Sequence, residues 1–452
     1  MPHHVNSKSC MIAVLALGVL GCDPAGDDPV EFRSATSKYN TGARNLHLQS
    51  TVRTNPTQPG ADADRGRRLF GLAADLDSSD STEALFEGDS VPFGGTVVSN
   101  GRTCFSCHRG TSEQLGLPPP PLSDHISLED PLFTAFDADA QGDPDGFFNL
   151  DQLGLVKYRP NRFNPKRDQS DPFRQAFAWR KSIPLVNTGL TVGFLNDMRG
   201  RVMFETARGA VFSHTQASDD RFDDLFTLED GADMEAFLFG AATLTDPTLA
   251  ALRDRNDPMY DVLVDEPFYT VALTTKAEKR GKKVFVRDCM GCHNMPNVFG
   301  NMDNVEALGN GDRPPNFPSW APAVGRAFNV GVGERNVHGL RFTRDAGEGS
   351  FEPIVLPLAN EDGTTNMHEI AFDIGLAMTT GRTDDIGRFK VPQLRGVKNN
   401  GPYFHDNSAA TLEDVVEYFN SDDYNESKDG VDAPISQTDQ EKADLLAFLN
   451  AL

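Results

Sequence analysis

Four stretches of the chain carry a spacing of apolar residues that predicts helices. Residues 64–70 and 276–286 are rich in charge, and each places a glycine and an aromatic residue four positions apart, on one helix face. A glycine there lets a second helix cross closely, and the aromatic side chain fills the crossing. Residues 412–419 follow a threonine and begin with acidic residues, which favours a helix start. Residues 438–452 gather leucines on one face and predict a closing amphipathic helix.

The start of the chain reads as an export signal, residues 1–21. Lys8 precedes an apolar run over residues 11–20, which is shorter than the ~20 residues of a membrane-spanning helix. The run ends before Cys22 in a pattern that resembles a bacterial lipobox, so we expect a lipid on the Cys22 thiol. The alternative is an ordinary secretory signal in which Cys22 has no role. Residues 22–62 are polar and proline-containing, which predicts a flexible tether.

Two segments of the chain match each other. Residues 65–70 (Arg-Gly-Arg-Arg-Leu-Phe) parallel residues 280–285 (Arg-Gly-Lys-Lys-Val-Phe), and a Cys-x-x-Cys-His motif follows each of them. In the first copy a stretch rich in glycine, serine and aspartate, residues 75–95, reads as an inserted surface loop. The copies lie further apart than the repeats of a solenoid do. We therefore expect two related, α-rich domains, residues 63–270 and 271–452.

The two cysteine motifs carry the chemistry of this sequence. Two thiols at this spacing can add to the two vinyl groups of one haem, and the histidine that follows can reach the iron. A zinc site would need further ligands from far away, and a redox dithiol would need a βαβ context that the sequence lacks. We therefore predict two covalently bound haems c, outside the cytoplasm. The residues that would hold them are Cys104, Cys107, His108, Cys289, Cys292 and His293.

Composition narrows the possible partners and the compartment. The 452 residues carry a formal net charge of −24 at pH 7, which argues against nucleic acid or an anionic membrane surface as the main partner. Charged residues make up 24% of the chain, which excludes a multi-span membrane protein. Of the six cysteines, Cys10 leaves with the signal, Cys22 takes the lipid and four hold haem, so no disulfide remains. The expected location is the periplasm or cell envelope, with contact to the membrane only through the lipid.

The sequence resembles the bacterial dihaem cytochrome c peroxidases and their relative MauG. The match is strongest over Phe389–Val397 (Phe-Lys-Val-Pro-Gln-Leu-Arg-Gly-Val) and continues through residues 401–413. It spans residues 63–452 and is thinner over the first half. The resemblance implies a mainly α fold of two cytochrome c-like haem domains with long loops, facing each other across a dihaem interface. It also implies that His108 is the proximal ligand of a peroxide-reacting haem and His293 that of an electron-transfer haem.

By the same resemblance, the distal pocket of the first haem falls on residues 205–211. Gln216 then stands where the family has its acid/base carboxylate or glutamine, and it is the expected catalytic partner of His108. Two residues in the segment depart from the family pattern, and the alternative is an ordinary surface helix end. His125 is a candidate sixth ligand of this haem, and His214 is a rival distal group.

Other positions depart from the family pattern. In the family a methionine or tyrosine is the sixth ligand of the second haem, and this position falls on Phe419 here. The alternatives are ligation by Tyr418, ligation by Met378, or no side-chain ligand. Ligation by tyrosine would lower the reduction potential, and ligation by methionine would raise it. The family's bridging tryptophan falls on Asn196, and Trp179 is the residue that could fill the gap.

The resemblance leaves a calcium ion open as a further cofactor. The family often holds calcium between its domains through backbone carbonyls, which fall here near Asn400 and Pro402. Its side-chain ligand falls on Ser182, which departs from the pattern. His405, in the same matched loop, is expected to pack near the second haem.

Three functions compete at this point. The first is an exported peroxidase that reduces hydrogen peroxide to water with electrons from a small cytochrome c or cupredoxin. The second is a MauG-like oxidase that modifies a partner protein, and the third is a dihaem electron carrier without a substrate. The electron donor, any protein substrate and the oligomeric state, a homodimer included, stay open.

Overall fold

The computed structural model describes residues 60–71, 100, 102–110, 114–135, 142–161, 168, 170–191, 193–200, 203–214, 226–254, 256–301 and 327–452. The backbone divides into the units Met1–Glu31 and Phe32–Leu452, and all described residues belong to the second. The predicted signal, the tether as far as residue 59, Cys22, the loop 75–95 and Gln216 lie outside the described residues.

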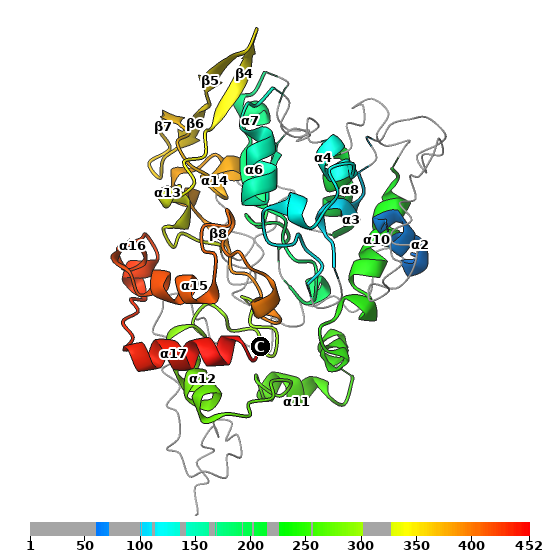
Figure 1. Cartoon of the computed structure of the whole chain (residues 1–452), viewed down its shortest axis with the longest axis vertical. Coiled ribbons are helices and arrows are strands. Elements are labelled where there is room, and N and C mark those ends of the chain that lie inside the picture. The colour runs from blue at the N-terminus through cyan, green and yellow to red at the C-terminus, as the bar shows by residue number, and fades with distance from the viewer. Residues whose placement is uncertain are drawn as a thin grey trace, which may run out of the picture. The chain divides into compact units, whose positions relative to one another are not determined.

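Short helices and strands alternate with long loops (Figure 1). Up to residue 265 the elements are α2 (Ala63–Phe70), α3 (Cys104–Cys107), η1 (Leu122–Asp124), α4 (Pro131–Thr134), α6 (Gly146–Leu153), β1 (Leu155–Tyr158), α7 (Pro172–Gln175), β2 (Ala178–Lys181), η2 (Thr188–Leu190), α8 (Met203–His214), α10 (Leu228–Leu238), η3 (Ala241–Thr243), η4 (Pro247–Arg253) and α11 (Tyr260–Asp265), where η marks a 3-10 helix. Beyond it they are α12 (Lys276–Asp288), β3 (Ala327–Phe328), α13 (Val332–Arg335), β4 (Thr343–Gly347), β5 (Ser350–Pro353), β6 (Val355–Ala359), β7 (Thr365–Glu369), α14 (Ala377–Thr380), η6 (Thr383–Asp385), β8 (Phe389–Lys390), η7 (Val397–Asn399), α15 (Leu412–Phe419), α16 (Asp422–Asn425), η8 (Gly430–Asp432) and α17 (Asp439–Leu449).

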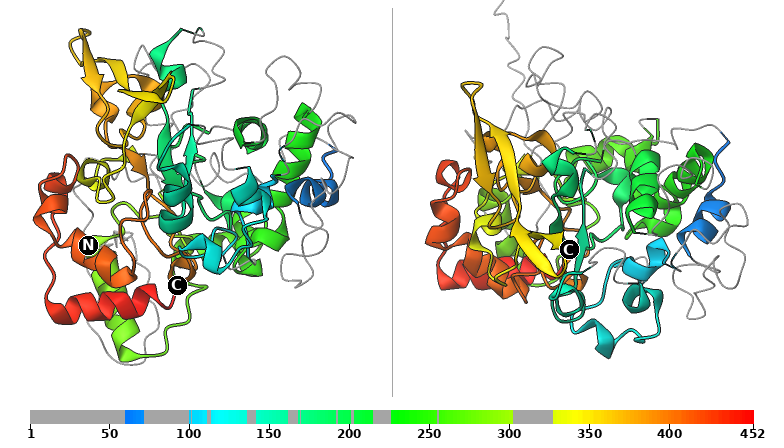
Figure 2. Two further views of the ribbon diagram at one scale, coloured as in Figure 1. Left: turned by 45° about the horizontal axis from the view of Figure 1, so that its top comes forward. Right: turned by 90° about the horizontal axis from the view of Figure 1, so that it is seen from above.

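The expected glycine-mediated helix crossings are confirmed in both halves. Helix α2 packs on α10, and α12 packs on α17 (Figure 2). A Cβ added at Gly66 would stand 1.9 Å from a backbone oxygen of α10, and one added at Gly281 would stand 1.9 Å from a backbone oxygen of α17. The aromatic partners meet in the crossings, with ring centroids 5.3 Å apart for Phe70 and 5.0 Å apart for Phe285. Only glycine permits such an approach of two backbones.

The two crossings also share an ion pair in the same place. Arg65 contacts Asp233 at 2.5 Å, and Arg280 contacts Asp444 at 2.6 Å. Each aspartate supplies the backbone oxygen that faces the glycine of its crossing. The sequence repeat therefore corresponds to a repeated two-helix unit.

A second pair of segments, not recognised in the sequence, repeats its backbone conformation. After β2 and after β8 the chain makes a 3-10 turn and then a short loop closed by one antiparallel bridge, Phe194 with Gly200 and Tyr403 with Ala409. Leu195 and Phe404 have φ of 71° and 69°, and Met198 and Asn407 both have 59°. Equivalent residues are related by one constant shift along the sequence without a gap. These two segments, residues 181–200 and 390–409, are called the paired loops below.

Strands are few and pair in twos. Among the described residues, the sheets are two-stranded and antiparallel: β1 with β2, β3 with β8, β4 with β5, and β6 with β7. The hairpins within residues 343–369 were not foreseen, so the mainly α expectation is confirmed only in part. Leu356 and Leu358 point from β6 into an apolar cluster with Trp179 of β2 and Met378 of α14, which we call the strand core.

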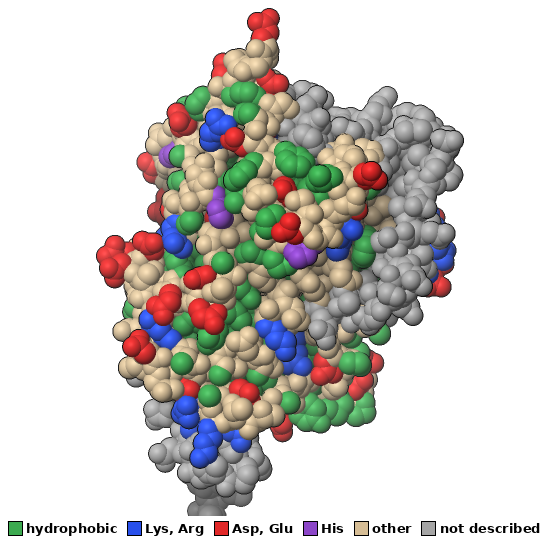
Figure 3. Space-filling view, in the orientation of Figure 1, with side chains coloured by type: hydrophobic (Ala, Val, Ile, Leu, Met, Phe, Trp, Pro, Cys, Tyr) green, Lys and Arg blue, Asp and Glu red, His purple; other side chains and the backbone are tan. Residues whose placement is uncertain are grey.

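Two further cores surround the helix crossings. The first crossing core joins α2, α3, α8 and α10 around Phe70 and Phe237. The second crossing core joins α12, α15 and α17 around Phe285 and Phe448. Acidic and basic side chains are scattered over the face drawn in Figure 3. Within the described ranges, no helix is both long enough and apolar enough to cross a bilayer.

Candidate functional site

The first cysteine motif stands between two apolar clusters. Residues 104–107 form the single turn α3, whose backbone is tied at its start by the Ser106 hydroxyl, 3.1 Å from the Thr103 N–H. Cys104 packs on the first crossing core, while Cys107 packs on a separate cluster that contains Leu122. Both thiols are half-buried, and neither forms a disulfide. One helical turn thus holds both thiols of the motif, each against apolar side chains.

His108, the next residue, has a half-buried ring beside a serine. Its Nδ1 lies 3.1 Å and its Nε2 3.4 Å from the Ser182 hydroxyl oxygen, and the Phe70 ring centroid is 6.4 Å away. Burial, with a smaller contribution from His214, lowers the pKa of His108 to about 4, although the backbones of Ile183 and Leu115 act in the opposite direction. The ring is therefore neutral at pH 7, which is the form that binds iron.

His293, after the second motif, has the same setting. Its Nδ1 donates to the carbonyl of Phe299 at 2.8 Å, and the Phe285 ring centroid is 6.4 Å away, as in the first motif. Burial lowers its pKa to about 4, opposed by the backbones of Phe299 and Pro392. A proton fixed on Nδ1 leaves Nε2 as the free acceptor, which is how a proximal histidine is oriented toward a metal.

These residues fit a covalently attached haem. Burial raises the pKa of Cys104 to about 12 and also raises the pKa of Cys289. Neither is therefore a low-pKa thiol of the kind that redox dithiols use. Within the described residues, no three His, Cys, Asp or Glu side chains converge as ligands of a single metal ion. When bound, a haem would supply an iron centre that can change oxidation state.

The surroundings of the second motif are aromatic. Phe404, Tyr418, Phe419 and Tyr424 form a chain of ring contacts with centroids 4.9–6.2 Å apart. Burial raises the pKa of Tyr424, and the thiols of Cys289 and Cys292 add to that rise. The aromatic chain therefore lies close to the second pair of cysteines.

The candidate sixth ligands of the second haem differ in the contacts that their side chains make. The Tyr418 hydroxyl donates to the carbonyl of Val330 at 2.5 Å, and the Arg335 guanidinium stands 4.7 Å above its ring. Met378 is fully buried in the strand core rather than in the second crossing core that holds Cys289. Of the two, Tyr418 is the side chain that the structure brings to the surroundings of the second motif.

On the first side, His214 rather than His125 lies near the proximal histidine. His214 ends α8, and its influence on the pKa of His108 shows the proximity of the two rings. His125 is exposed and follows η1, whose Leu122 faces the cluster that contacts Cys107. The predicted distal segment, residues 205–211, lies within α8, while Gln216 follows it outside the described residues.

Asn196, at the position of the family's tryptophan, has a structural role between the paired loops. Its side-chain N–H₂ donates to the backbone carbonyl of Lys181 at 3.2 Å. Its backbone carbonyl accepts from the backbone N–H of Lys390 at 2.7 Å. Trp179, the residue that could fill the gap, is 1% exposed in the strand core and packs edge-on against Phe177.

The residues present do not fit calcium. The carbonyls of Asn400 and Pro402 accept hydrogen bonds from the Lys181 ammonium, at 2.7 Å in the case of Asn400. Ser182, the expected side-chain ligand, contacts His108 instead. A cation is thus already in place at these carbonyls. Burial lowers the pKa of Lys181 to about 8, so the amine is still mostly charged at pH 7.

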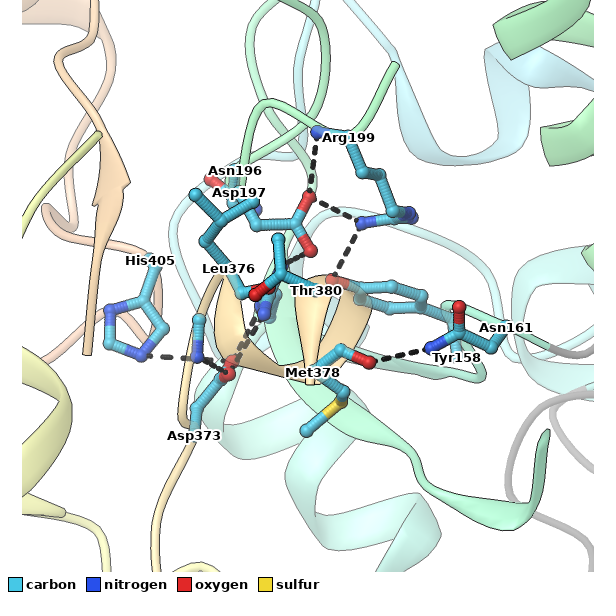
Figure 4. Close-up of polar contacts among 12 residues, drawn as sticks. Tyr158, Asn161, Asn196, Asp197, Arg199, Asp373, Leu376, Met378, Thr380 and His405 are labelled. Carbon is cyan, nitrogen blue, oxygen red and sulfur yellow. Dashed lines mark hydrogen bonds and ion pairs between the residues drawn. The ribbon is translucent and has the colours of Figure 1, made fainter. Parts of the chain in front are cut away.

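A buried ionic cluster was missed in the sequence. Arg180 contacts Asp373 at 2.5 Å and Asp197 at 3.0 Å, and Arg199 holds the other oxygen of Asp197 at 2.8 Å (Figure 4). His405 stacks on Phe389 with centroids 3.8 Å apart and lies 3.9 Å from Asp373. His405, which was expected to pack near the second haem, is buried, and its neighbours among the described residues are Phe389 and this ionic cluster. The sequence did not indicate that these charged residues form a cluster, because the partners are distant in sequence.

Comparison with known proteins gives short but specific matches. Over 81 residues the chain is 41% identical to a cytochrome-c peroxidase of Denitromonas iodatirespirans and 36% identical to one of Pseudomonas sp. (strain SCT). These matches cover 18% of this chain and only 22% and 21% of the two relatives. No family model matches the chain.

Solved structures give a distant similarity in addition. One is a MauG-like protein associated with microbial copper homeostasis, 18% identical, covering 89% of this chain and 92% of its own, with a TM-score of 0.43. Another is a dihaem peroxidase from Burkholderia thailandensis, 16% identical, covering 86% and 85%, with a TM-score of 0.40. The resemblance read from the sequence is confirmed over the matched 81 residues, where the chain is similar to the two cytochrome-c peroxidases.

Proposed function

We propose that this chain is an exported dihaem c-type peroxidase, which reduces hydrogen peroxide to water. The observation that carries the proposal is the repeated setting of His108 and His293. Each is a half-buried imidazole that is neutral at pH 7, each directly follows a pair of half-buried cysteines, and each lies beside a phenylalanine ring of a glycine-mediated helix crossing. The relation to curated cytochrome-c peroxidases supports the same reaction.

The roles of the two sites follow from the family resemblance and the local chemistry. Cys104 and Cys107 would anchor the haem at which peroxide reacts, and Ser182 would hold the ring of His108. Gln216 would move a proton between the two oxygens of peroxide, which assists cleavage of the O–O bond. Cys289, Cys292 and His293 would hold the haem that receives and stores electrons. The two domains would face each other across the interface between these haems.

The electron donor is proposed to be a small, basic cytochrome c or cupredoxin. The net charge of −24 would steer a positively charged donor toward the protein, an effect that weakens as salt screens the charges. A lipid on Cys22 would keep the enzyme in the cell envelope, and replacing Cys22 by serine should release it into the soluble periplasmic fraction.

A second candidate is a MauG-like oxidase acting on a partner protein. The observation in its favour is Tyr418, which is buried near the second cysteine pair and whose chemistry as a ligand would stabilise oxidised iron. In this case peroxide would oxidise the holoprotein, but reduced cytochrome c would not restore it in repeated turnovers.

Peroxide turnover with a reduced donor separates the functions. The holoprotein is mixed with reduced cytochrome c and peroxide, and donor oxidation is followed optically together with the haem spectrum. Steady donor oxidation supports the peroxidase, and a spectral change without turnover supports the oxidase. A protein with two fully ligated haems and no response to peroxide would be an electron carrier.

Two variants assign the sites in the same assay. His108→Gly should abolish turnover with the second haem spectrum intact, and retained turnover would place the chemistry on the other haem. Gln216→Ala should slow the reaction with peroxide at unchanged haem content, and an unchanged rate would remove Gln216 from the mechanism.

A further inference from the structure

Two half-buried lysines stand at equivalent positions of the paired loops. Lys181 ends β2 and Lys390 ends β8, and each begins one of the two loops. Burial is the cause that lowers the pKa of each amine, and neither forms an ion pair with a described carboxylate. A buried ammonium without a counter-ion needs other acceptors.

Each lysine finds its acceptors in the other loop. The Lys181 ammonium donates to the carbonyls of Asn400 and Pro402. The Lys390 ammonium donates to the carbonyl of Gly193 at 2.7 Å and lies 3.3 Å from the hydroxyl of Thr191.

The backbones of the two lysines repeat this exchange. The Lys181 N–H donates to the carbonyl of His405 at 2.7 Å, and the Lys390 N–H donates to that of Asn196 at 2.7 Å. His405 is the counterpart of Asn196 in the paired loops, as Asn400 is of Thr191 and Pro402 of Gly193. The two loops are therefore joined by reciprocal contacts at equivalent positions, which differ only in that Lys390 contacts the hydroxyl of Thr191 where Lys181 contacts the backbone carbonyl of Asn400.

A group of converging carbonyl oxygens is the environment that a hard cation such as calcium selects. Calcium would sit about 2.3–2.6 Å from each oxygen. The Lys181 nitrogen lies 2.7 Å from the carbonyl of Asn400, so it occupies the same space. Its positive charge would also repel a second cation.

We propose that Lys181 is a tethered cation that takes the place of a divalent metal ion at the carbonyls of Asn400 and Pro402, so that the protein needs no calcium. Lys390 performs the equivalent task at the other loop. The inference rests on these contacts alone and holds whichever reaction the haems perform.

The position of Lys181 gives this cation a further effect. Its neighbour Ser182 lies 3.1 Å from the ring of His108. The ammonium therefore fixes loop 390–409 to the strand end that holds the proximal histidine of the first motif. Lys181 is in this sense a positioning residue for His108.

The first test uses the unmodified holoprotein. Calorimetric titration with calcium chloride should show no stoichiometric binding, and the thermal unfolding midpoint should be the same in calcium and in a chelator. Stoichiometric calcium binding, or a midpoint that falls in the chelator, would overturn the proposal. This test is decisive even if a variant fails to fold.

Two variants at one position extend the test. Lys181→Met keeps the length of the stem without the charge, and it should lower the unfolding midpoint in a way that calcium does not restore. Lys181→Ser empties the space, and calcium should raise its lowered midpoint, because a ligand that binds only the folded state stabilises it. A Lys181→Met protein as stable as the parent, or a Lys181→Ser protein indifferent to calcium, would contradict the proposal.

The His108 effect has its own readout. In Lys181→Met the absorption spectrum of the first haem should change, while that of the second should not. The matched variant Lys390→Met should leave the first haem spectrum unchanged, since Lys390 does not adjoin Ser182. Equal changes in both variants would show a general loss of structure and refute the positioning role.

Discussion

Replacing Arg180 by methionine should destabilise the protein far more than the loss of an ordinary ion pair. Arg180 is 1% exposed and holds two carboxylates that are themselves buried, Asp197 and Asp373. Methionine keeps much of the apolar stem of the side chain, while the guanidinium contacts with the rings of Tyr158 and Phe389 are lost together with the charge. The perturbation is then mainly electrostatic.

Removal of Arg180 takes a larger share of the compensating positive charge from Asp373 than from Asp197. Asp197 keeps Arg199 at 2.8 Å. Asp373 keeps the N–H of Gly375 at 2.8 Å and the ring of His405 at 3.9 Å, but no other described guanidinium or ammonium contacts it. One buried carboxylate is thus left nearly uncompensated, which costs about 3–5 kcal/mol. Stabilities of about 5–15 kcal/mol make this a large fraction of the whole.

The pH dependence identifies the mechanism. In the parent, burial raises the pKa of Asp373, but Arg180 outweighs it and the net pKa lies below the usual value. Its stabilising contribution is therefore present at neutral pH and lost as pH falls through this lowered pKa. Without Arg180 only the smaller effects of His405 and the Gly375 N–H oppose burial, so the pKa of Asp373 rises and the folded variant takes up a proton more readily. The stability gap between parent and variant should be widest at neutral pH and narrow toward acid.

Urea unfolding followed by circular dichroism at several pH values measures this gap. The double variant Arg180→Met with Asp373→Leu should recover a large part of the lost stability, because the uncompensated charge is gone. Arg344→Met, which removes an exposed pair with Glu352, should change little and serves as the control. A loss below about 1 kcal/mol, or a gap that is constant with pH, would refute the reasoning.

Further predictions concern the crossings and the proximal side. Gly281→Ala should cost more than about 2 kcal/mol in urea unfolding, because its new Cβ would meet a backbone oxygen of α17 at 1.9 Å. Gly209→Ala in α8, where a Cβ meets nothing, should be neutral or gain up to about 1 kcal/mol, and a similar loss at both positions would contradict the crossing argument. Ser182→Ala should shift the reduction potential of the first haem and leave haem content unchanged; an unaltered potential would show that Ser182 does not act on His108.

The elements that could be predicted from the sequence are those with local causes. The crossings followed from a glycine and an aromatic residue on one helix face, and the helices expected at 412–419 and 438–452 are observed as α15 and α17. The side chains of Thr411 and Thr438 cap these helices, as a threonine just ahead of an acidic first turn indicates. The haem-binding motifs were readable for the same reason, since their chemistry needs only a fixed short spacing.

What could not be predicted depends on backbone conformation and on contacts between distant residues. The paired loops share φ angles near 60–70° at Leu195 and Phe404, but these two side chains have little in common beyond being apolar. Arg180 and Asp373 are 193 residues apart, and nothing in either neighbourhood marks them as partners. The role of Lys181 could not be predicted from the sequence, because the family's ligand position falls on the neighbouring residue, Ser182. In the structure Ser182 contacts His108, and Lys181 supplies the cation.

The paired loops also suggest how two similar motifs become chemically different. Each histidine ring lies beside two backbone groups. These belong to Ile183 and Leu115 for His108, and to Pro392 and Phe299 for His293. The residue after Lys181 is Ser182, whose hydroxyl reaches the ring of His108, whereas the residue after Lys390 is Val391, which has no hydrogen-bonding group. Hydrogen bonds to the ring of a metal-binding histidine tune its basicity and hence the metal. The Ser182 hydroxyl therefore gives the ring of His108 a contact that Val391 cannot give the ring of His293, and this difference within the paired loops would make the two imidazoles differ in basicity.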